Sequence, residues 1–543
     1  MNKAAVKRLL GEVPLAAEVY WQIRQSGKPL NRSFSLQRAQ KHLPAWRATV
    51  QASLSAGGWK TPCKKVLLFA ELHYWIEHAL LMGLALAGQG HDVVLAYLPY
   101  PNWHRVIPRF DLRRHNAYAQ SVLGMAKPYL QPVSLLNISS NAPLPSELEQ
   151  ALCQLSERDV QYTLQIEDVD PESKLYQLRL ERNTWAAKAV LQWLQVHEPD
   201  VVLTPNGSIL EMGAVYLVAR WLGIPVVTYE FGEQRGRIWL AQNAEVMRQE
   251  TDGLWQARGD QPLSAAQQEQ IRELFTSRQR ADLWQNFARR WQGQPSQGGE
   301  RARVGLGLDS RPCVLLAANV IGDSLTLGRQ VFSASMTEWL QRTVSYFAGR
   351  PDVQLLVRIH PGERYTKGPS VADVLRQAVP ELPDHIRLVA AGDPINTYDL
   401  IEIADLGLVY TTTVGMEMAM SGVPVIVAGQ THYRGKGFTF DPNSWQAYWE
   451  MLDNFLADEA GGRLSRKQVE QAWNYAYRFF FEFPQPFPWR LLGMWEELRE
   501  WSLERVLSAQ GEQAFGRTFR YLLGEAVDWT LGDRTVLPLL EGR

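Results

Sequence analysis

Two short stretches in the second half of the chain carry residue types suited to anion binding. The first, "VRIHPGE", ends an apolar run with Arg358 and His360, which share one face of an extended chain before Pro361 stops the strand. A guanidinium and an imidazole at one strand end suit a phosphate or a carboxylate. A lone histidine is more often structural, so that alternative stays open.

The second stretch, "VYTTTVGMEMAMSGVPVIVAG", contains a single formally charged side chain, Glu417. The pattern predicts a strand, a turn, a short helix and a strand, and the hydroxyls of Thr411, Thr412 and Thr413 at the turn can cap the helix or bind an anion. A capping box needs Ser or Thr three residues before Glu417, where the chain has Val414. Because a buried, unpartnered charge is costly, we expect Glu417 to face a polar ligand or a basic residue.

Other polar residues in this half also follow apolar runs. Asn319 and Asp323 come after the first of them, and Arg434 and Lys436 lie in the glycine-rich loop "GQTHYRGKGFT" after the last. Ligands of open parallel sheets bind at the carboxyl ends of the strands, so we expect these side chains to converge on one edge. The alternative for the loop is an ordinary solvated turn.

The first half of the chain offers a weaker set of polar side chains. Glu71 and His73 lie at the end of its first apolar run, and Asn206, Glu230 and Glu233 follow later runs. One of the carboxylates, or His73, is a candidate general base for an acceptor hydroxyl. Each of these positions also has a purely structural alternative.

Several familiar sites are missing from the sequence. Neither GxGxxG nor a P-loop stands at a strand-to-helix turn, which argues against a dinucleotide oxidoreductase and a Walker NTPase. The histidines of "HYWIEH" are five residues apart, unlike those of HExxH, and Cys63, Cys153 and Cys313 form no CxxC pair. We therefore expect no metal, no cofactor and no disulfide framework.

The elements that must position these residues alternate between strand and helix patterns. Strand patterns start at "KKVLLFAEL" and, after a polar stretch, again at "PCVLLAANV", so the sequence predicts an α/β protein with two Rossmann-like halves in tandem. The predicted segments are a basic helical extension (1–60), a first domain (61–295), a linker (296–311), a second domain (312–480) and a C-terminal helical segment (481–543). The aromatic residues of the last segment would be explained if it crossed back onto the first domain.

Charge is unevenly distributed along the chain. The 543 residues carry a formal net charge of -1, but residues 1–65 contain 12 Lys and Arg against Glu12 and Glu18 alone. Residues 4–23 have apolar side chains at helical spacing, with Pro14 as a kink, which predicts a basic amphipathic helix. It either docks onto an anionic membrane surface or packs on its own domain.

Location and partners follow from the same patterns. No apolar run reaches the roughly 18 residues that cross a bilayer, and the N-terminal residues lack the continuous apolar h-region and cleavage site of a signal peptide. We expect a cytoplasmic protein, at the inner membrane face if the N-terminal helix docks there. Nucleic-acid binding is unlikely because the basic region is one amphipathic segment.

Taken together, the two halves, "RIHPGE", "YTTTVGMEMAMSGVPVIVAG" and "THYRGKGFT" resemble the GT-B glycosyltransferases of the capsule polysaccharide biosynthesis family, which includes Kdo transferases. The resemblance is clearest over residues 312–440. It implies two Rossmann-like domains facing a cleft, with a nucleotide-sugar donor on the second domain and a polysaccharide or lipid-linked acceptor against the first.

The resemblance also implies roles for particular residues. Glu417 would bind the donor ribose, Arg358 and His360 the donor phosphate or a sugar carboxylate, and the threonine turn the phosphate. The predicted donor-binding set is Asn319, Asp323, Arg358, Thr411, Thr412, Thr413, Gly415, Glu417, Arg434 and Lys436. The catalytic candidates are His360, Glu230 and Glu71, and the acceptor-side set is His73, Asn206 and Glu233.

Two alternatives remain beside a metal-independent glycosyltransferase. One keeps the fold but changes the reaction, to polyol-phosphate transfer or nucleotide-sugar epimerisation. The other is a non-catalytic nucleotide-sugar-binding subunit that docks partners through Trp-rich surfaces. Identifying the products distinguishes glycosyl transfer from the two alternative reactions. Turnover of any donor distinguishes all of these enzymes from the non-catalytic subunit.

Overall fold

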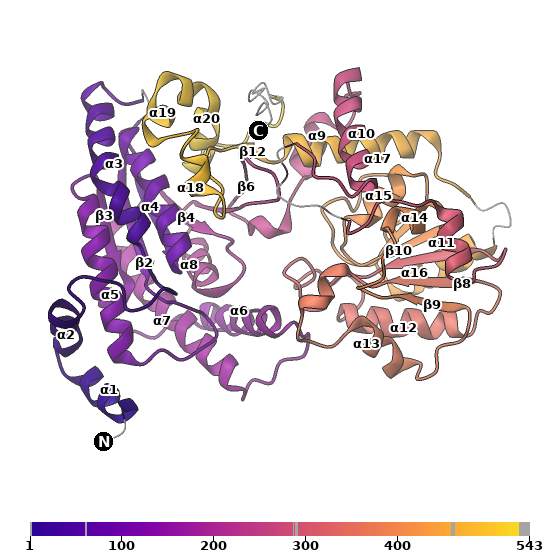
Figure 1. The fold of residues 1–543 in the computed structure, drawn as a ribbon, viewed down its shortest axis with the longest axis horizontal. Helices are drawn as coiled ribbons and strands as arrows, with labels where there is room; N and C mark the ends of the chain where they lie inside the picture. The colour runs from indigo at the N-terminus through magenta and orange to yellow at the C-terminus, as the bar shows by residue number, and fades with distance from the viewer. Residues whose placement is uncertain (1–2, 60–61, 286, 288–291, 458–461, 532–543) are drawn as a thin grey trace. The chain divides into compact units, whose positions relative to one another are not determined.

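A computed structural model describes residues 3–59, 62–285, 287, 292–457 and 462–531 (Figure 1). The chain divides into two compact units. Unit 1 comprises the residues up to Asp159, then Asp170–Met247 and Pro484–Val527. Unit 2 comprises Val160–Val169, Arg248–Phe483 and the residues from Asp528 onward.

Unit 1 is built on a seven-stranded sheet of order β12-β6-β5-β4-β1-β2-β3. The strands from β5 to β3 in that order are parallel, whereas β6 and β12 extend one edge in antiparallel pairing. The strands are β1 (Lys65–Glu71), β2 (Asp92–Leu98), β3 (Leu130–Ser134), β4 (Val201–Pro205), β5 (Val226–Glu230), β6 (Arg237–Gln242) and β12 (Gln485–Pro486).

Helices cover both faces of this sheet, as the nearly continuous apolar strands require. Leu67 and Phe69 of β1 share one core with side chains of α6, α7 and α8, while α4 packs on β1, β2 and β3. The helices of unit 1 are α1 (Lys3–Glu12), α2 (Ala16–Arg24), α3 (Gln37–Ser55), α4 (His73–Gly88), α5 (Arg109–Leu123), α6 (Ser146–Leu164, which runs on into unit 2), α7 (Lys174–His197), α8 (Leu210–Trp221), α18 (Met494–Glu497), α19 (Leu503–Leu507) and α20 (Ala509–Leu522), with short turns η1 (Gly124–Ala126) and η2 (Leu135–Asn137).

The C-terminal part of the chain returns to unit 1. Helix α19 packs on α3 and α4, and α20 packs on β12; Figure 1 shows these yellow elements beside the indigo and purple ones. The Trp489 carbonyl lies 3.0 Å from Nε2 of the fully buried His78, whose ring is surrounded by Trp75, Tyr229 and Phe231. The aromatic residues of the segment therefore serve as core for unit 1.

Unit 2 is built on a five-stranded parallel sheet of order β11-β10-β7-β8-β9. Its strands are β7 (Cys313–Ala317), β8 (Gln354–Arg358), β9 (Ile386–Val389), β10 (Leu406–Val409) and β11 (Val425–Val427). Its helices are α9 (Asp252–Arg258), α10 (Ala265–Gln279), α11 (Gly299–Gly305), α12 (Met336–Ala348), α13 (Val371–Ala378), α14 (Thr397–Glu402), α15 (Val414–Met420), α16 (Trp445–Ala457) and α17 (Arg466–Tyr477), with short turns η3 (Val246–Arg248), η4 (Pro361–Tyr365) and η5 (Arg478–Glu482).

The fold class expected from the strand and helix patterns is confirmed, since each unit is a Rossmann-like α/β layer structure. The boundaries differ from our prediction. The described part of residues 1–59 belongs to unit 1 and is not a separate extension. The described part of residues 248–295 belongs to unit 2, where the Thr251 hydroxyl, just before α9, donates to the His432 carbonyl at 2.7 Å. The expected linker 296–311 contains α11, and Asp399 accepts bonds from the backbone of Gln297 and Gly298.

The described part of the chain contains no helix that is both long and apolar enough to span a bilayer.

Candidate functional site

The polar centre of unit 2 lies where its strand order reverses. The chain moves from β7 outward to β8 and β9, then returns to the other side of β7 with β10 and β11. Ligands of doubly wound folds bind beyond the carboxyl ends of the strands at such a switch point. The loops after β7 and β10 meet there, because the Thr411 N–H donates to Oδ1 of Asn319 at 3.1 Å.

Two polar groups at this switch point make no hydrogen bond to the described residues. One is the buried hydroxyl Oγ1 of Thr411, and the other is Nδ2 of Asn319, whose amide oxygen accepts the Thr411 N–H. Leaving a buried hydroxyl unsatisfied costs about 1–3 kcal/mol. A polar ligand between these two groups would satisfy both.

The other predicted residues of the β10 turn have structural contacts. Oγ1 of Thr412 accepts the Val414 N–H at 3.4 Å, which caps the start of α15, and the Thr412 carbonyl accepts the Tyr433 hydroxyl at 2.6 Å. Thr413 is half-buried and makes no side-chain cap bond to α15. A Cβ on Gly415 would lie 2.5 Å from the Tyr433 hydroxyl, so glycine is required there for close packing.

Glu417 takes a basic partner inside unit 2. Its Oε1 accepts a hydrogen bond from Nη1 of Arg278 at 2.7 Å, and both side chains are buried. The Arg278 guanidinium also lies between the rings of Phe275 and Phe480. Burial raises the pKa of Glu417 above its ordinary value, while Arg278 and the Tyr398 hydroxyl oppose the rise. Of the two partners expected for Glu417, the structure supplies the basic residue.

Arg278 was not among the predicted site residues, because we selected only polar residues that follow predicted strands. The helix pattern of α10 nevertheless marks it. The buried positions of α10 are Ile271, Leu274, Phe275 and Arg278, one continuous stripe at i, i+3, i+4 and i+7. A cation in line with a core stripe predicts a buried carboxylate partner elsewhere, although the pattern does not say which one.

The predicted phosphate-binding cations of unit 2 form hydrogen bonds or ion pairs with groups of the protein itself. Arg358 donates to the carbonyls of Ala390 (2.9 Å) and Ile395 (3.2 Å), tying the end of β8 to the loop after β9. Arg434 donates to the carbonyls of Val427 and Pro442, which clamps its own loop. Lys436 forms an ion pair with Asp252. These contacts argue against all three as free phosphate ligands.

Two further basic side chains lie in the loops after β8 and β7, His360 and Arg329, and Nη1 of Arg329 donates to the Arg248 carbonyl at 3.3 Å. His360 is exposed, and its Nδ1 accepts the Gly362 N–H at 3.0 Å, which assigns the ring proton to Nε2. Arg329, which the sequence analysis did not select, is buried in the loop after β7, and its carbonyl accepts the Gln430 N–H at 2.8 Å. Asp323, half-buried in the same loop, accepts a bond from Ser324.

Unit 1 has its own switch point, between β1 and β4. The two loops that leave it carry non-glycine residues with positive φ, Leu72 at 59° and Asn206 at 56°. For a leucine this conformation is strained, and strain of this kind concentrates at functional sites. Asn206 Nδ2 donates to Glu230 Oε2 at 3.2 Å, so the ends of β4 and β5 are linked here.

The predicted acceptor-side residues differ in accessibility. Glu230 is half-buried at the end of β5, and burial raises the pKa of its carboxyl. His73 is half-buried at the first position of α4, and burial lowers the pKa of its imidazole. Glu233 is half-buried in the following loop. A carboxylate of raised pKa and a neutral imidazole are both suited to proton abstraction near neutral pH.

Glu71 lies inside the unit instead of at its edge. Strand alternation places it on the face of Leu67 and Phe69, toward α7 and α8, where Arg179 bonds Asp159 at 3.0 Å and Glu211 at 2.9 Å. Glu71 is completely buried, and burial together with the Glu211 charge raises its pKa well above the ordinary value. This position argues against our prediction that Glu71 is a general base for a substrate hydroxyl.

No group of three or more His, Cys, Asp or Glu side chains within the described residues is arranged to hold a metal ion.

The chain is similar to several solved structures. One is a KpsC from Thermosulfurimonas dismutans described as a beta Kdo 2,4 transferase, with 15% identity, coverage of 53% of this chain and 82% of that one, and a TM-score of 0.33. A KpsC of the same organism described as a beta Kdo 2,7 transferase has 13% identity, coverage of 58% and 90%, and a TM-score of 0.32. A putative UDP-N-acetylglucosamine 2-epimerase from Listeria monocytogenes has 13% identity, coverage of 76% and 91%, and a TM-score of 0.27.

The family that the motifs resemble is therefore represented among these structures, as is the epimerase alternative. At such identities and TM-scores the similarity decides nothing about the reaction of this chain. No protein-family model and no curated protein sequence matches it.

Proposed function

We propose that this chain is a metal-independent glycosyltransferase that moves a sugar from a nucleotide-activated donor to a cell-surface polysaccharide or glycolipid acceptor. The observation that carries the proposal is Thr411 Oγ1 at the switch point of unit 2, a buried hydroxyl with no hydrogen bond, beside Asn319, whose Oδ1 accepts the Thr411 N–H. The motif resemblance supports the same assignment.

On the donor side, Thr411 and Asn319 would hydrogen-bond the donor, and His360 and Arg329, in the loops after β8 and β7, would be its basic contacts. His360 would act as a neutral Nε2–H donor because its Nδ1 already accepts the Gly362 N–H. A leaving nucleotide phosphate gains negative charge as the glycosidic bond breaks, and donors preorganised toward it lower the barrier. Glu417 would act indirectly, by holding α10 against α15 through Arg278.

On the acceptor side, Glu230 is the proposed general base. It is more accessible than Glu71, its pKa is raised by burial, and Asn206 fixes one of its oxygens. The base would take the proton of the acceptor hydroxyl as that oxygen attacks the anomeric carbon of the donor sugar. His73 and Glu233 are proposed to contact the acceptor.

The proposal is tested with the isosteric change Thr411→Val. Because Oγ1 of Thr411 has no protein partner, the change should leave the melting temperature unchanged or raise it slightly. Loss of a hydrogen bond to a charged ligand costs about 1.5–3 kcal/mol, so donor affinity should fall roughly 10- to 100-fold. Thr439→Val, which removes a hydroxyl bonded to Asp441, is the matched control and should leave donor affinity unchanged.

Donor binding is measured first, by thermal shift against CMP-, UDP-, GDP- and CDP-linked sugars and polyols, and the products are then identified with an acceptor present. Glycosyl transfer supports the proposal. Phosphodiester formation or release of an epimer would move the assignment to the alternative reactions on the same fold. Nucleotide binding without turnover of any donor would indicate the non-catalytic subunit.

A further inference from the structure

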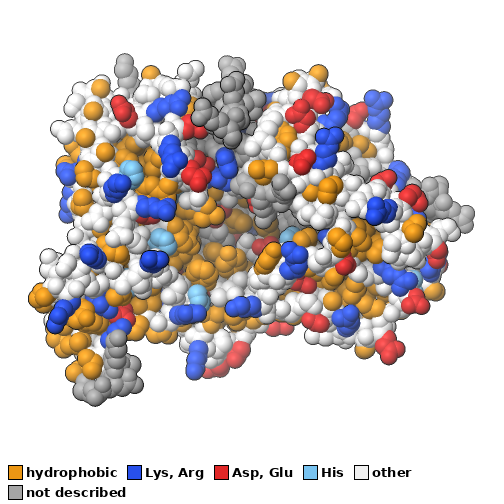
Figure 2. All heavy atoms as spheres, in the orientation of Figure 1, with side chains coloured by type: hydrophobic (Ala, Val, Ile, Leu, Met, Phe, Trp, Pro, Cys, Tyr) orange, Lys and Arg blue, Asp and Glu red, His pale blue; other side chains and the backbone are white. Residues whose placement is uncertain are grey.

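We infer that α1 and α2 form a docking face for an anionic lipid bilayer. This inference is independent of the proposed transfer reaction, since it rests only on the surface of unit 1. The residues that define the docking face are five large apolar side chains, Leu9 (63% exposed), Val13 (44%), Leu15 (68%), Val19 (51%) and Ile23 (70%). Figure 2 shows hydrophobic side chains gathered over these two helices, with Lys and Arg side chains beside them.

Apolar side chains lie on the exposed side of α2 as well as on its buried side. The inner side of α2 carries Ala17 and Trp21, both buried, whereas Val19 and Ile23 are exposed. A folding unit gains free energy by turning its apolar face inward, so an outward stripe of this size marks a surface that binds something.

Polar contacts hold the helices in this orientation against α5. Glu18 pairs with Arg113 at 2.6 Å, Lys7 pairs with Asp111 at 2.9 Å, and Glu12 pairs with Arg109. The Arg113 guanidinium also donates to the Val13 carbonyl at 2.7 Å, at the break between α1 and α2. These contacts therefore fix the orientation in which the apolar stripe is exposed.

These contacts also leave the face positively charged. The acidic residues Glu12, Glu18 and Asp111 are all used by basic partners. Arg8, Arg24 and Lys28 are exposed, and none of them forms an ion pair with any described residue. Apolar side chains that penetrate the headgroup boundary, flanked by unpaired cations that reach the phosphates, are the arrangement of an interfacial helix on an anionic bilayer.

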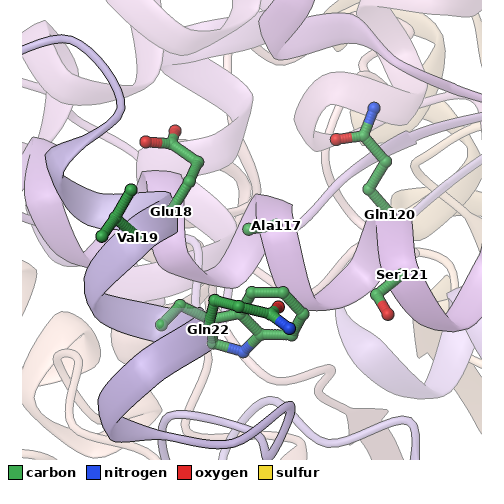
Figure 3. A pocket seen from close by; sticks show the side chains of 7 residues that line it. Glu18, Val19, Gln22, Ala117, Gln120 and Ser121 are labelled. Atoms are coloured by element: carbon green, nitrogen blue, oxygen red, sulfur yellow. The ribbon is translucent and has the colours of Figure 1, made fainter.

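A shallow groove continues the docking face from α2 to α5. It has a volume of about 470 Å³, and Figure 3 shows Glu18, Val19 and Gln22 of α2 on one side and Ala117, Gln120 and Ser121 of α5 on the other. The groove places polar side chains beside the apolar stripe, where they would meet the lipid headgroups.

The test uses the full-length chain and co-sedimentation with vesicles, without donor or acceptor. Vesicles of phosphatidylcholine mixed with phosphatidylglycerol should bind the chain, and pure phosphatidylcholine vesicles should bind it much less. The apolar variant Leu9→Ser/Val19→Ser/Ile23→Ser should weaken binding by about tenfold or more. The cationic variant Arg8→Gln/Arg24→Gln/Lys28→Gln should weaken it about fivefold per residue and reduce its salt dependence.

The matched control replaces three exposed apolar side chains elsewhere in unit 1, Leu54→Ser/Val196→Ser/Leu492→Ser, and should bind as the wild type does. Melting curves verify that each variant is folded; if a triple variant is not, the single change Ile23→Ser is used, because that side chain is 70% exposed.

Three results would overturn the inference. The first is equal binding of the chain to neutral and anionic vesicles. The second is binding of the apolar and cationic variants to anionic vesicles as strongly as the wild type. The third is a wild-type chain that dimerises without lipid, with an apolar variant that is monomeric but binds vesicles unchanged. The last would assign the face to a second copy of the chain. Because donor and acceptor are absent from the assay, none of these results depends on the proposed transferase activity.

Discussion

Glu417 Oε1 and Arg278 Nη1 are joined by a 2.7 Å charge-assisted hydrogen bond although they stand far apart in the sequence, on α15 and α10. The bond connects a helix next to the switch point of unit 2 with a helix that precedes the sheet of that unit. It also changes what a mutation at Glu417 is expected to do, because a ligand-binding carboxylate and a buried ion-pair partner respond differently.

The first prediction concerns this ion pair. Glu417→Ala leaves the Arg278 charge buried without its partner, and breaking a buried pair on one side costs about 3–5 kcal/mol. We expect the free energy of unfolding in urea to fall by about that amount. The double variant Arg278→Met/Glu417→Leu should recover most of it, since apolar replacement of a buried pair is often neutral or stabilising. A Glu417→Ala variant of wild-type stability that no longer binds donor would instead restore the ribose-binding role.

The second prediction concerns Glu71. Burial and the Glu211 charge raise its pKa well above the ordinary value, which favours the neutral acid, and glutamine is the close isostere of that form. We expect Glu71→Gln to retain both stability, within about 1 kcal/mol, and transfer activity. The contrasting change Arg179→Met leaves Asp159 and Glu211 unpaired and should destabilise strongly. Inactive but stable Glu71→Gln would reinstate Glu71 as a catalytic group.

The third prediction separates Glu230 from its neighbours. If Glu230 is the base, Glu230→Gln should lower kcat by about 10²- to 10⁴-fold while donor affinity stays unchanged. The acidic limb of the pH–rate profile, where the base becomes protonated, should be lost as well. Glu233→Gln serves as the control from the same loop and should change KM for the acceptor more than kcat. Retention of the acidic limb in Glu230→Gln would point to His73.

The fourth prediction is a pH dependence of stability in unit 1. Burial raises the pKa of Glu77 to about 7, against the opposing effects of the Ala39 N–H and Arg38. The folded state therefore keeps a proton that the unfolded state has released, and stability falls as pH rises from about 4.5 to 7. Glu77→Gln removes this dependence, so the variant should gain about 3 kcal/mol relative to wild type over that range.

The measurement for Glu77 is a series of urea unfolding curves across pH, taken as the difference between variant and wild type. The difference is needed because burial lowers the pKa values of His78 and His115 to about 4. These histidines make the folded state less stable as pH falls, which opposes the effect of Glu77 on the wild-type curve. A difference that stays flat from pH 4.5 to 7 would show that Glu77 is not proton-linked to folding.

The sequence determined the layer architecture, because the strand and helix periods are local. The apolar runs that form β1, β2, β4, β5, β7, β8, β9, β10 and β11 were each recognisable in the sequence, as were the polar residues at their ends. The short edge strand β3 and the antiparallel β6 were not predicted, since half-buried edge strands carry little apolar signal.

The tertiary structure decided which charges meet. The sequence predicted a partner for Glu417, but only the packing of α10 identifies that partner as Arg278. Likewise, only the folded loops show that Arg358, Arg434 and Lys436 bind backbone carbonyls or a carboxylate of the protein. The pattern of residues 4–23 left open whether its apolar side chains face inward or outward, and in the structure ion pairs to α5 hold several of them on the exposed side. Periodicity is a property of neighbours in sequence, whereas burial and ion pairing depend on residues brought together from distant parts of the chain.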